Sequence, residues 1–129
     1  MFLFSFLYPR PKARDFDYDY HRRHHMALGI GLAKLHLGIQ PKMFWVERIG
    51  EDDPQSEEKY CAIVHLAFET QDDRDRLFGL MNVPEAVEQL FADYAHYTDT
   101  PPEVRVSRMT IDDDIPAIIE QFNMARIIA

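Results

Sequence analysis

The hydrophobic and polar positions of the chain alternate in four short segments that predict β-strands. The first segment is apolar on both of its faces, and the third has one fully apolar face. An acidic, proline-containing stretch between the second and third segments predicts a hairpin with a long loop. The predicted strands are residues 1–8, 42–49, 59–68 and 103–111.

A first helix is predicted between the first two strands. Asp17 suits its N-cap, because a short carboxylate can accept a hydrogen bond from a free backbone N–H of the first turn. The helix is expected to end near Leu28, since Gly29 and Gly31 weaken any continuation. Residues 34–41 are then expected to form a loop.

Two more helices are predicted between the third and fourth strands, and one follows the last strand. Thr70 suits the cap of the first, and Pro84 suits the opening turn of the second. Residues 112–114 are acidic and precede an amphipathic stripe of isoleucines and Phe122, so they predict the cap of a last helix.

The order of these elements predicts an α+β fold. Strand, helix, strand, strand, helix, strand is the ferredoxin-like βαββαβ arrangement, an antiparallel sheet with its helices on one face. We assign residues 1–111 to this domain and residues 112–129 to a C-terminal helical extension. The opposite sheet face would be hydrophobic, which soluble monomers rarely expose. We therefore expect a homodimer through that open face, with the extension at the interface or packed on its own subunit.

Composition and charge narrow the classes of partner. The chain has 129 residues, of which 47% are hydrophobic, and suits one domain with a sizeable core. Its formal net charge of −8 argues against nucleic acid and against an anionic membrane surface. The only cysteine, Cys61, cannot form an internal disulfide. Because the apolar N-terminus lacks the features of a signal peptide, we expect a cytoplasmic protein.

The candidate chemistry is concentrated in residues 16–28, which hold three of the six histidines. His21 and His25 are four residues apart and share one helix face, where core contacts would be expected. Such a pair can bind a metal, with His65 as the best third ligand. The glutamate of an HExxH motif is missing and two arginines intervene, so we expect no metal. The chain also lacks cofactor-binding glycine motifs, and we expect no cofactor.

Several motifs resemble those of EthD-domain proteins, a family with the dimeric α+β barrel fold. By this match His25 is the family's histidine. Ala27 stands where proline is usual, and His21 replaces a second aromatic residue. The matching segments are Leu7-Tyr8-Pro9, Phe16-Asp17 with Tyr20, His25-Met26-Ala27-Leu28, His65-Leu66-Ala67-Phe68, Ala92-Asp93 and Tyr97-Thr98-Asp99. The resemblance covers residues 1–111.

Three residues are candidates for chemistry. His25 is the candidate general acid or base, because histidine exchanges a proton near neutral pH. Asp93 is the candidate partner that orients its ring. Tyr20 is a candidate donor to a substrate oxygen, as is Tyr97. Each residue also has a structural interpretation: a helix histidine paired with a carboxylate, and tyrosines packed in an aromatic core.

Four further residues are candidate ligand contacts, and two function hypotheses follow. The candidate contacts are His21, His65, Tyr97 and Trp45. EthD proteins accompany ether-degrading monooxygenase systems. The resemblance therefore implies a small dimeric protein that binds an aromatic or polyketide-like molecule, in an auxiliary role to an oxygenase or catabolic pathway. The alternative is a cofactor-independent isomerase, cyclase or monooxygenase that uses His25. Fold kinship does not choose between them.

Overall fold

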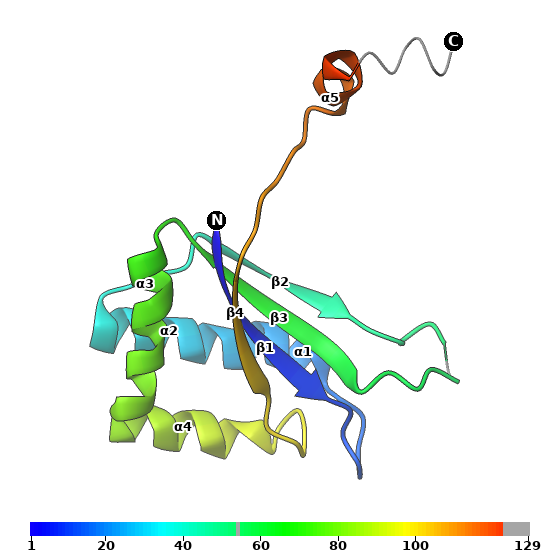
Figure 1. Ribbon diagram of the computed structural model, residues 1–129. Coiled ribbons are helices and arrows are strands. Elements are labelled where there is room, and N and C mark those ends of the chain that lie inside the picture. The colour runs from blue at the N-terminus through cyan, green and yellow to red at the C-terminus, as the bar shows by residue number, and fades with distance from the viewer. Residues whose placement is uncertain (54, 123–129) are drawn as a thin grey trace.

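Residues 1–53 and 55–122 are described by a computed structural model, in which a four-stranded sheet carries helices on one face (Figure 1). The strands are β1 (Phe2–Pro9), β2 (Met43–Arg48), β3 (Tyr60–Phe68) and β4 (Glu103–Arg108). The helical elements are α1 (Tyr18–Tyr20), η1 (His21–His25), α2 (Met26–Leu37), α3 (Gln71–Arg76), η2 (Leu77–Asn82), α4 (Pro84–Tyr94) and α5 (Ile115–Gln121). The predicted element order is confirmed.

The sheet has the strand order β2-β3-β1-β4, and each neighbouring pair is antiparallel. β1 and β3 are therefore the central strands, and β2 and β4 are the edges. Phe4 on β1 lies opposite Leu66 on β3 and Val106 on β4. This order is that of the split βαβ unit, so the predicted ferredoxin-like α+β class is confirmed.

The first helical segment is longer than predicted. Asp17 caps it as expected, accepting a hydrogen bond from the Tyr20 N–H at 3.0 Å. The segment then runs through η1 and α2 to Leu37, so the predicted end near Leu28 is wrong. Each glycine costs a helix about 1 kcal/mol, which burial of the apolar face of α2 outweighs. The helix ends at Gly38, whose φ of 67° suits a glycine after a last turn.

The helices between β3 and β4 form as predicted. Thr70 accepts a hydrogen bond from the Asp73 N–H at 3.1 Å and caps α3, which continues into the 3₁₀ turns of η2. Pro84 opens α4 in its first turn, where a missing N–H costs nothing. Within residues 1–53 and 55–122, none of the helices has both the length and the apolarity that crossing a membrane requires.

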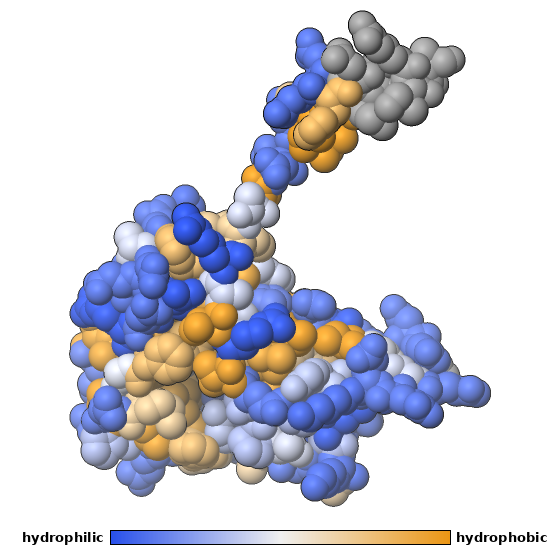
Figure 2. All heavy atoms as spheres, in the orientation of Figure 1, coloured by the Kyte–Doolittle hydropathy of each residue, from blue (hydrophilic) through white to orange (hydrophobic). Residues whose placement is uncertain are grey.

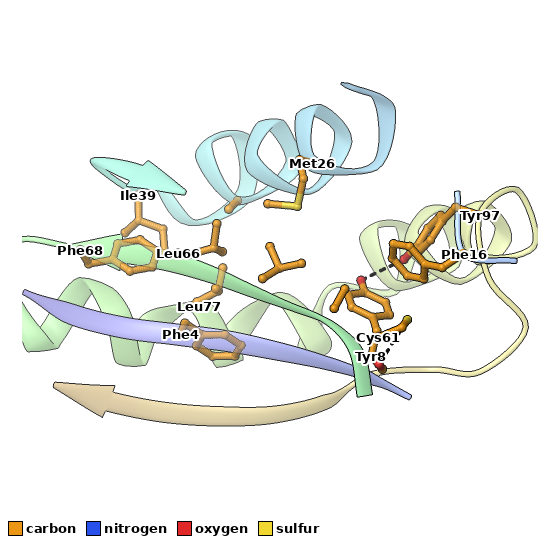
Figure 3. Packing of buried hydrophobic residues seen from close by; sticks show 13 residues of the cluster. Phe4, Tyr8, Phe16, Met26, Ile39, Cys61, Leu66, Phe68, Leu77 and Tyr97 are labelled. Atoms are coloured by element: carbon orange, nitrogen blue, oxygen red, sulfur yellow. Dashed lines mark hydrogen bonds between the residues drawn. The ribbon is translucent and has the colours of Figure 1, made fainter. Parts of the chain in front are cut away.

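The main hydrophobic core lies between the helical face of the sheet and the segments that cover it (Figure 3). β1 and β3 contribute alternate residues, because successive strand side chains point to opposite faces. Each large core side chain stabilises the fold by about 1.5–3 kcal/mol. The core includes Phe4, Tyr8, Phe16, Met26, Ala33, Ile39, Val64, Leu66, Phe68, Leu77 and Tyr97.

The sheet face opposite the helices is less apolar than predicted. One row across all four strands is formed by Trp45, His65, Ser5 and Arg105. Leu3 and Leu7, which flank Ser5 on this face of β1, are buried within the single chain. The open face is therefore a mixed polar and apolar surface, and the homodimer through it stays a prediction.

The chain leaves the sheet soon after β4. Its last ladder contacts join Met109 and Met1, so β4 is shorter than the predicted strand to Ile111. The chain then extends away from the body to α5, which stands apart in Figure 1. Asp114 caps α5 as predicted, accepting a hydrogen bond from the Ala117 N–H at 3.1 Å. Residues 123–129 of the predicted extension lie outside the described residues.

Candidate functional site

The π-helical turn η1 places two histidines on the inner side of the first helical segment. The Met26 N–H donates to the carbonyl of His21, five residues earlier, which defines the wider winding. His21 and His25 are both buried, and their rings stack with centroids 5.6 Å apart. The arginines between them in sequence, Arg22 and Arg23, are exposed. Turns of this kind occur frequently at functional sites.

Asp93, near the end of α4, gathers three side chains of the first helical segment. Nδ1 of His25 lies 2.9 Å from its Oδ2, and the hydroxyl of Tyr20 donates to its Oδ1 at 2.6 Å. Nδ1 of His24 lies 3.3 Å from the same Oδ1. The predicted contact between His25 and Asp93 is therefore present, and Asp93 joins α4 to η1.

The hydrogen bonds fix the protonation of this group. Burial raises the pKa of Asp93, but donors from Tyr20 and His25 outweigh it and hold that pKa below its ordinary value. Burial lowers the pKa of His25, and the contact with Asp93 offsets this only in part. A neutral His25 beside a carboxylate carries its proton on Nδ1, which leaves the lone pair on Nε2. The hydrogen bond to Asp93 raises the pKa of Tyr20 to about 12.

A cavity of about 90 Å³ lies between α2, α4 and the sheet, and His25 forms part of its wall. No charged side chain is found among the described residues that line it. Because Asp93 holds Nδ1 of His25, Nε2 is the ring nitrogen left for a ligand. The other lining residues are Phe6, Tyr8, Met26, Gly29, Ile30, Ala33, Pro41, Leu66, Phe68, Leu77, Met81, Leu90 and Tyr94.

The hydroxyls of the two tyrosines predicted as donors, Tyr20 and Tyr97, are already paired. The hydroxyl of Tyr97 lies 3.0 Å from that of Tyr8 in the core (Figure 3), and the hydroxyl of Tyr20 is held by Asp93. Burial raises the pKa of both Tyr8 and Tyr97, so both stay protonated. The predicted donation from Tyr20 or Tyr97 to a substrate oxygen would therefore require a change of partner. Sequence reasoning did not name Tyr8 as a site residue, although the matching segment Leu7-Tyr8-Pro9 already contained it.

His21 lies in an aromatic cage and is only 1% exposed. Tyr8, Phe16 and Tyr97 surround its ring, each with a centroid within 5.5 Å. Within the described part of the chain, neither of its ring nitrogens has a hydrogen-bond partner. Burial lowers its pKa to about 3, so the ring is neutral. His21 does not line the cavity, and its predicted ligand contact stays a prediction.

The other two predicted ligand contacts lie on the open face of the sheet. His65 stacks on Trp45 with centroids 5.2 Å apart, and its Nδ1 lies 2.7 Å from Oγ of Ser5. Its Nε2 lies 3.1 Å from Oε1 of Glu47. The sheet separates this group from His25. In residues 1–53 and 55–122 no three histidine, cysteine or acidic side chains come together as a metal site.

Comparisons with known proteins bear on the fold. No protein-family model matches the chain, and a search of curated proteins finds no match. Among solved structures, the chain is similar to the crystal structure of an EthD-like protein from Ralstonia eutropha. The two are 18% identical, with a TM-score of 0.61 over 88% of this chain and 95% of the other. The chain has an EthD-like fold. At this identity the likeness establishes the fold alone.

The EthD-like fold brings together motifs that are distant in sequence. Tyr8 comes from β1, His25 from η1, Asp93 from α4 and Tyr97 from the loop after it. In the folded chain His25 contacts Asp93, and the rings of His25 and Tyr97 lie 4.7 Å apart. Five residues of the motifs that resemble EthD-domain proteins line the cavity, while the motif residue His65 lies across the sheet. The five are Tyr8, His25, Met26, Leu66 and Phe68.

Proposed function

We propose that the protein binds a small, uncharged, hydrophobic molecule, aromatic or polyketide-like, through one weakly acidic hydroxyl. The observation that carries this proposal is the neutral imidazole of His25 in the wall of an apolar cavity. Its Nδ1 is held by Asp93, and its Nε2 has no hydrogen-bond partner among the described residues. Nε2 would accept the ligand's hydroxyl proton in a hydrogen bond. The apolar lining would take the rest of the molecule, since burial of apolar surface contributes about 25 cal/mol per Å².

The lining argues against charged ligands. A carboxylate in this cavity would lose its hydration without gaining a cation, and the nearby Asp93 would repel it. The volume argues for a small ligand, because about 90 Å³ is less than the roughly 150 Å³ of a known cavity that binds benzene. We expect a ring to enter by rotation of Met81, whose side chain forms part of the wall and is 60% exposed.

A ligand series tests the proposal. Phenol, anisole and benzoate share an aromatic ring. Phenol carries a hydrogen-bond donor, anisole carries none, and benzoate carries a negative charge. Phenol is expected to raise the melting temperature most, because a ligand that prefers the folded state stabilises it. The rise should shrink in His25→Gln and persist in His36→Gln, a histidine that does not line the cavity. Equal shifts with all three compounds, or a shift indifferent to His25, would refute the role of Nε2.

A second candidate function is proton transfer by His25. The arrangement that favours it is a carboxylate on Nδ1 and a free Nε2, the geometry in which a histidine acts as a general base. His25 would remove a proton from carbon beside a carbonyl and return it to another position, as a cofactor-independent isomerase or cyclase requires. Such a base contributes about 10²–10⁴-fold to a rate.

Hydrogen–deuterium exchange at the acidic C–H of a β-diketone, followed by NMR, separates the two candidates. If His25 is a base, wild type should accelerate exchange and His25→Gln should not. Equal rates with the two proteins would exclude proton transfer from this probe and leave binding as the function. The assay needs no knowledge of the natural ligand.

Two further parts of the proposal concern partners. We propose a homodimer through the open sheet face, and an auxiliary role beside an oxygenase, supported by strand patterning and by the resemblance to EthD-domain proteins. Sedimentation of wild type and Ile63→Asp, a partly buried position of that face, tests the dimer. A smaller sedimentation coefficient is expected for Ile63→Asp, and an unchanged coefficient would count against the open-face interface. Co-purification with an oxygenase tests the second part.

A further inference from the structure

The C-terminal arm, residues 109–122, carries an apolar stripe that its own body does not cover. The stripe consists of Ile115 and Ile119 on α5 and of Phe122 at its C-cap. Their spacings of four and three residues put them on one side of the helix. They are 55%, 37% and 66% exposed. Figure 2 shows hydrophobic side chains on α5 standing away from the body. A seven-residue helix of this kind is marginal in water and needs a packing partner.

The body carries an exposed apolar surface of similar length, which we name the β4 strip. It consists of Phe78 and Met81 on η2 and Val104 and Val106 on β4, all more than 40% exposed. Phe78 and Val106 are linked through the buried Phe4, whose ring lies 4.8 Å from that of Phe78 and which is paired with Val106. Figure 2 shows hydrophobic side chains gathered on the face of the body that carries β4.

Charge and length match between the arm and the strip. Arg108 ends the strip on the same strand face as Val106, and its guanidinium lies 5.1 Å from the centre of the Phe2 ring. No salt bridge among the described residues includes Arg108. Asp112, Asp113 and Asp114 precede the stripe of α5. Four strand residues span about 13 Å, and seven helix residues span about 10 Å. An arm docked along the strip could therefore place its acidic residues at Arg108 and its apolar stripe over the valines.

We propose that the arm of one copy docks on the β4 strip of a second copy, and that the exchange is reciprocal. Each chain offers one arm and one strip, so the exchange closes as a two-fold dimer. The arm's own direction favours a second copy, since the chain beyond Met109 leads away from the strip (Figure 1). The strip lies on the helical side of β4. This contact is therefore separate from the open sheet face and does not rest on the proposed ligand.

Thiol cross-linking between two different chains tests the exchange. One chain carries Val106→Cys and the other Ile119→Cys, and a short bismaleimide is added to their mixture. Both positions are exposed, so neither substitution should prevent folding. The native Cys61 is buried. A cross-linked heterodimer is expected, identified by mass spectrometry. A matched control replaces Val106→Cys with Glu58→Cys, an exposed residue between β2 and β3 at the other sheet edge, and should give none.

The remaining outcomes overturn the proposal. A cross-link that forms only within a chain carrying both cysteines would mean that the arm folds on its own body. No cross-link in either experiment would mean that the arm docks elsewhere. A charge exchange adds a second readout: Arg108→Asp should weaken dimerisation about tenfold, and adding Asp113→Arg to the same chain should restore it. Failure of the restoration would overturn the proposed placement of the arm along the strip.

Discussion

Asp93 and His25 face each other between α4 and η1, with Oδ2 and Nδ1 2.9 Å apart in a buried setting. This contact fixes the ring orientation of His25 and determines which nitrogen carries the proton. The Asp93 carboxylate also accepts a hydrogen bond from the Tyr20 hydroxyl. The arrangement therefore depends on three side chains, those of Tyr20, His25 and Asp93, from two helical segments. Its stability can be measured independently of any ligand.

Removing the hydroxyl of Tyr20 should destabilise the protein. Tyr20→Phe leaves the carboxylate of Asp93 with one fewer donor, so the free energy of unfolding should fall. Urea unfolding at neutral pH measures this loss. The pKa of Asp93 should rise as well. Wild-type stability in Tyr20→Phe would show that the hydroxyl contributes nothing to holding Asp93.

Replacing His21 with phenylalanine should stabilise the protein. The imidazole loses its hydration in the aromatic cage and has no partner there within the described residues, which costs about 1–3 kcal/mol. A ring of similar shape without polar atoms avoids that cost. Urea unfolding of His21→Phe is expected to show a higher free energy of unfolding. His36→Phe, near the end of α2, should show no comparable gain.

Mild acid should destabilise the fold at pH values well above those at which its carboxylates titrate. The pKa of His21 is lowered by burial from 6.5 to about 3, and that of His25 is also lowered. The unfolded chain therefore binds more protons than the folded one below pH 6.5, and stability falls as pH decreases toward 3. Unfolding measured between pH 7 and pH 4 should show this slope. The slope should be smaller in His21→Phe, and an equal slope would contradict the assignment.

The two glycines of α2 offer a matched pair. A Cβ on Gly31 would meet nothing within 4 Å, whereas one on Gly29 would lie 3.8 Å from Leu90 and beside the cavity. Both Gly29→Ala and Gly31→Ala should raise the free energy of unfolding by about 0.5–1 kcal/mol, because alanine favours the helix. Only Gly29→Ala should weaken phenol binding. If calorimetry shows equal weakening by both, the ligand does not occupy this cavity.

Sequence reasoning predicted the parts of the fold that local chemistry dictates. The caps at Asp17 and Thr70 and the opening turn at Pro84 are read from single residues and their neighbours, and all three are present. The end of the first helix was wrong because glycine propensity, at about 1 kcal/mol a residue, is smaller than the tertiary packing of α2. That packing involves residues distant in sequence.

The site was predictable only in part, because it too depends on packing between residues that are distant in sequence. The pairing of His25 with Asp93 was expected and is present, while their role in chemistry stays a prediction. The involvement of Tyr8 and the separation of Trp45 from His25 depend on which sheet face each strand position occupies. Which strand positions face the core is determined by the helices, because they cover only one face of the sheet.

The π-helical turn makes the site depend on one additional residue. An α-helix advances about 100° per residue, so a segment held by bonds five residues apart is out of register with the regular helix on either side. Deleting one exposed arginine of η1, such as Arg23, would let the segment rewind as an ordinary α-helix. Every residue before the deletion would then rotate relative to α2, and Tyr20 would no longer reach Asp93. A more regular helix would thus be obtained only by dismantling the group around Asp93.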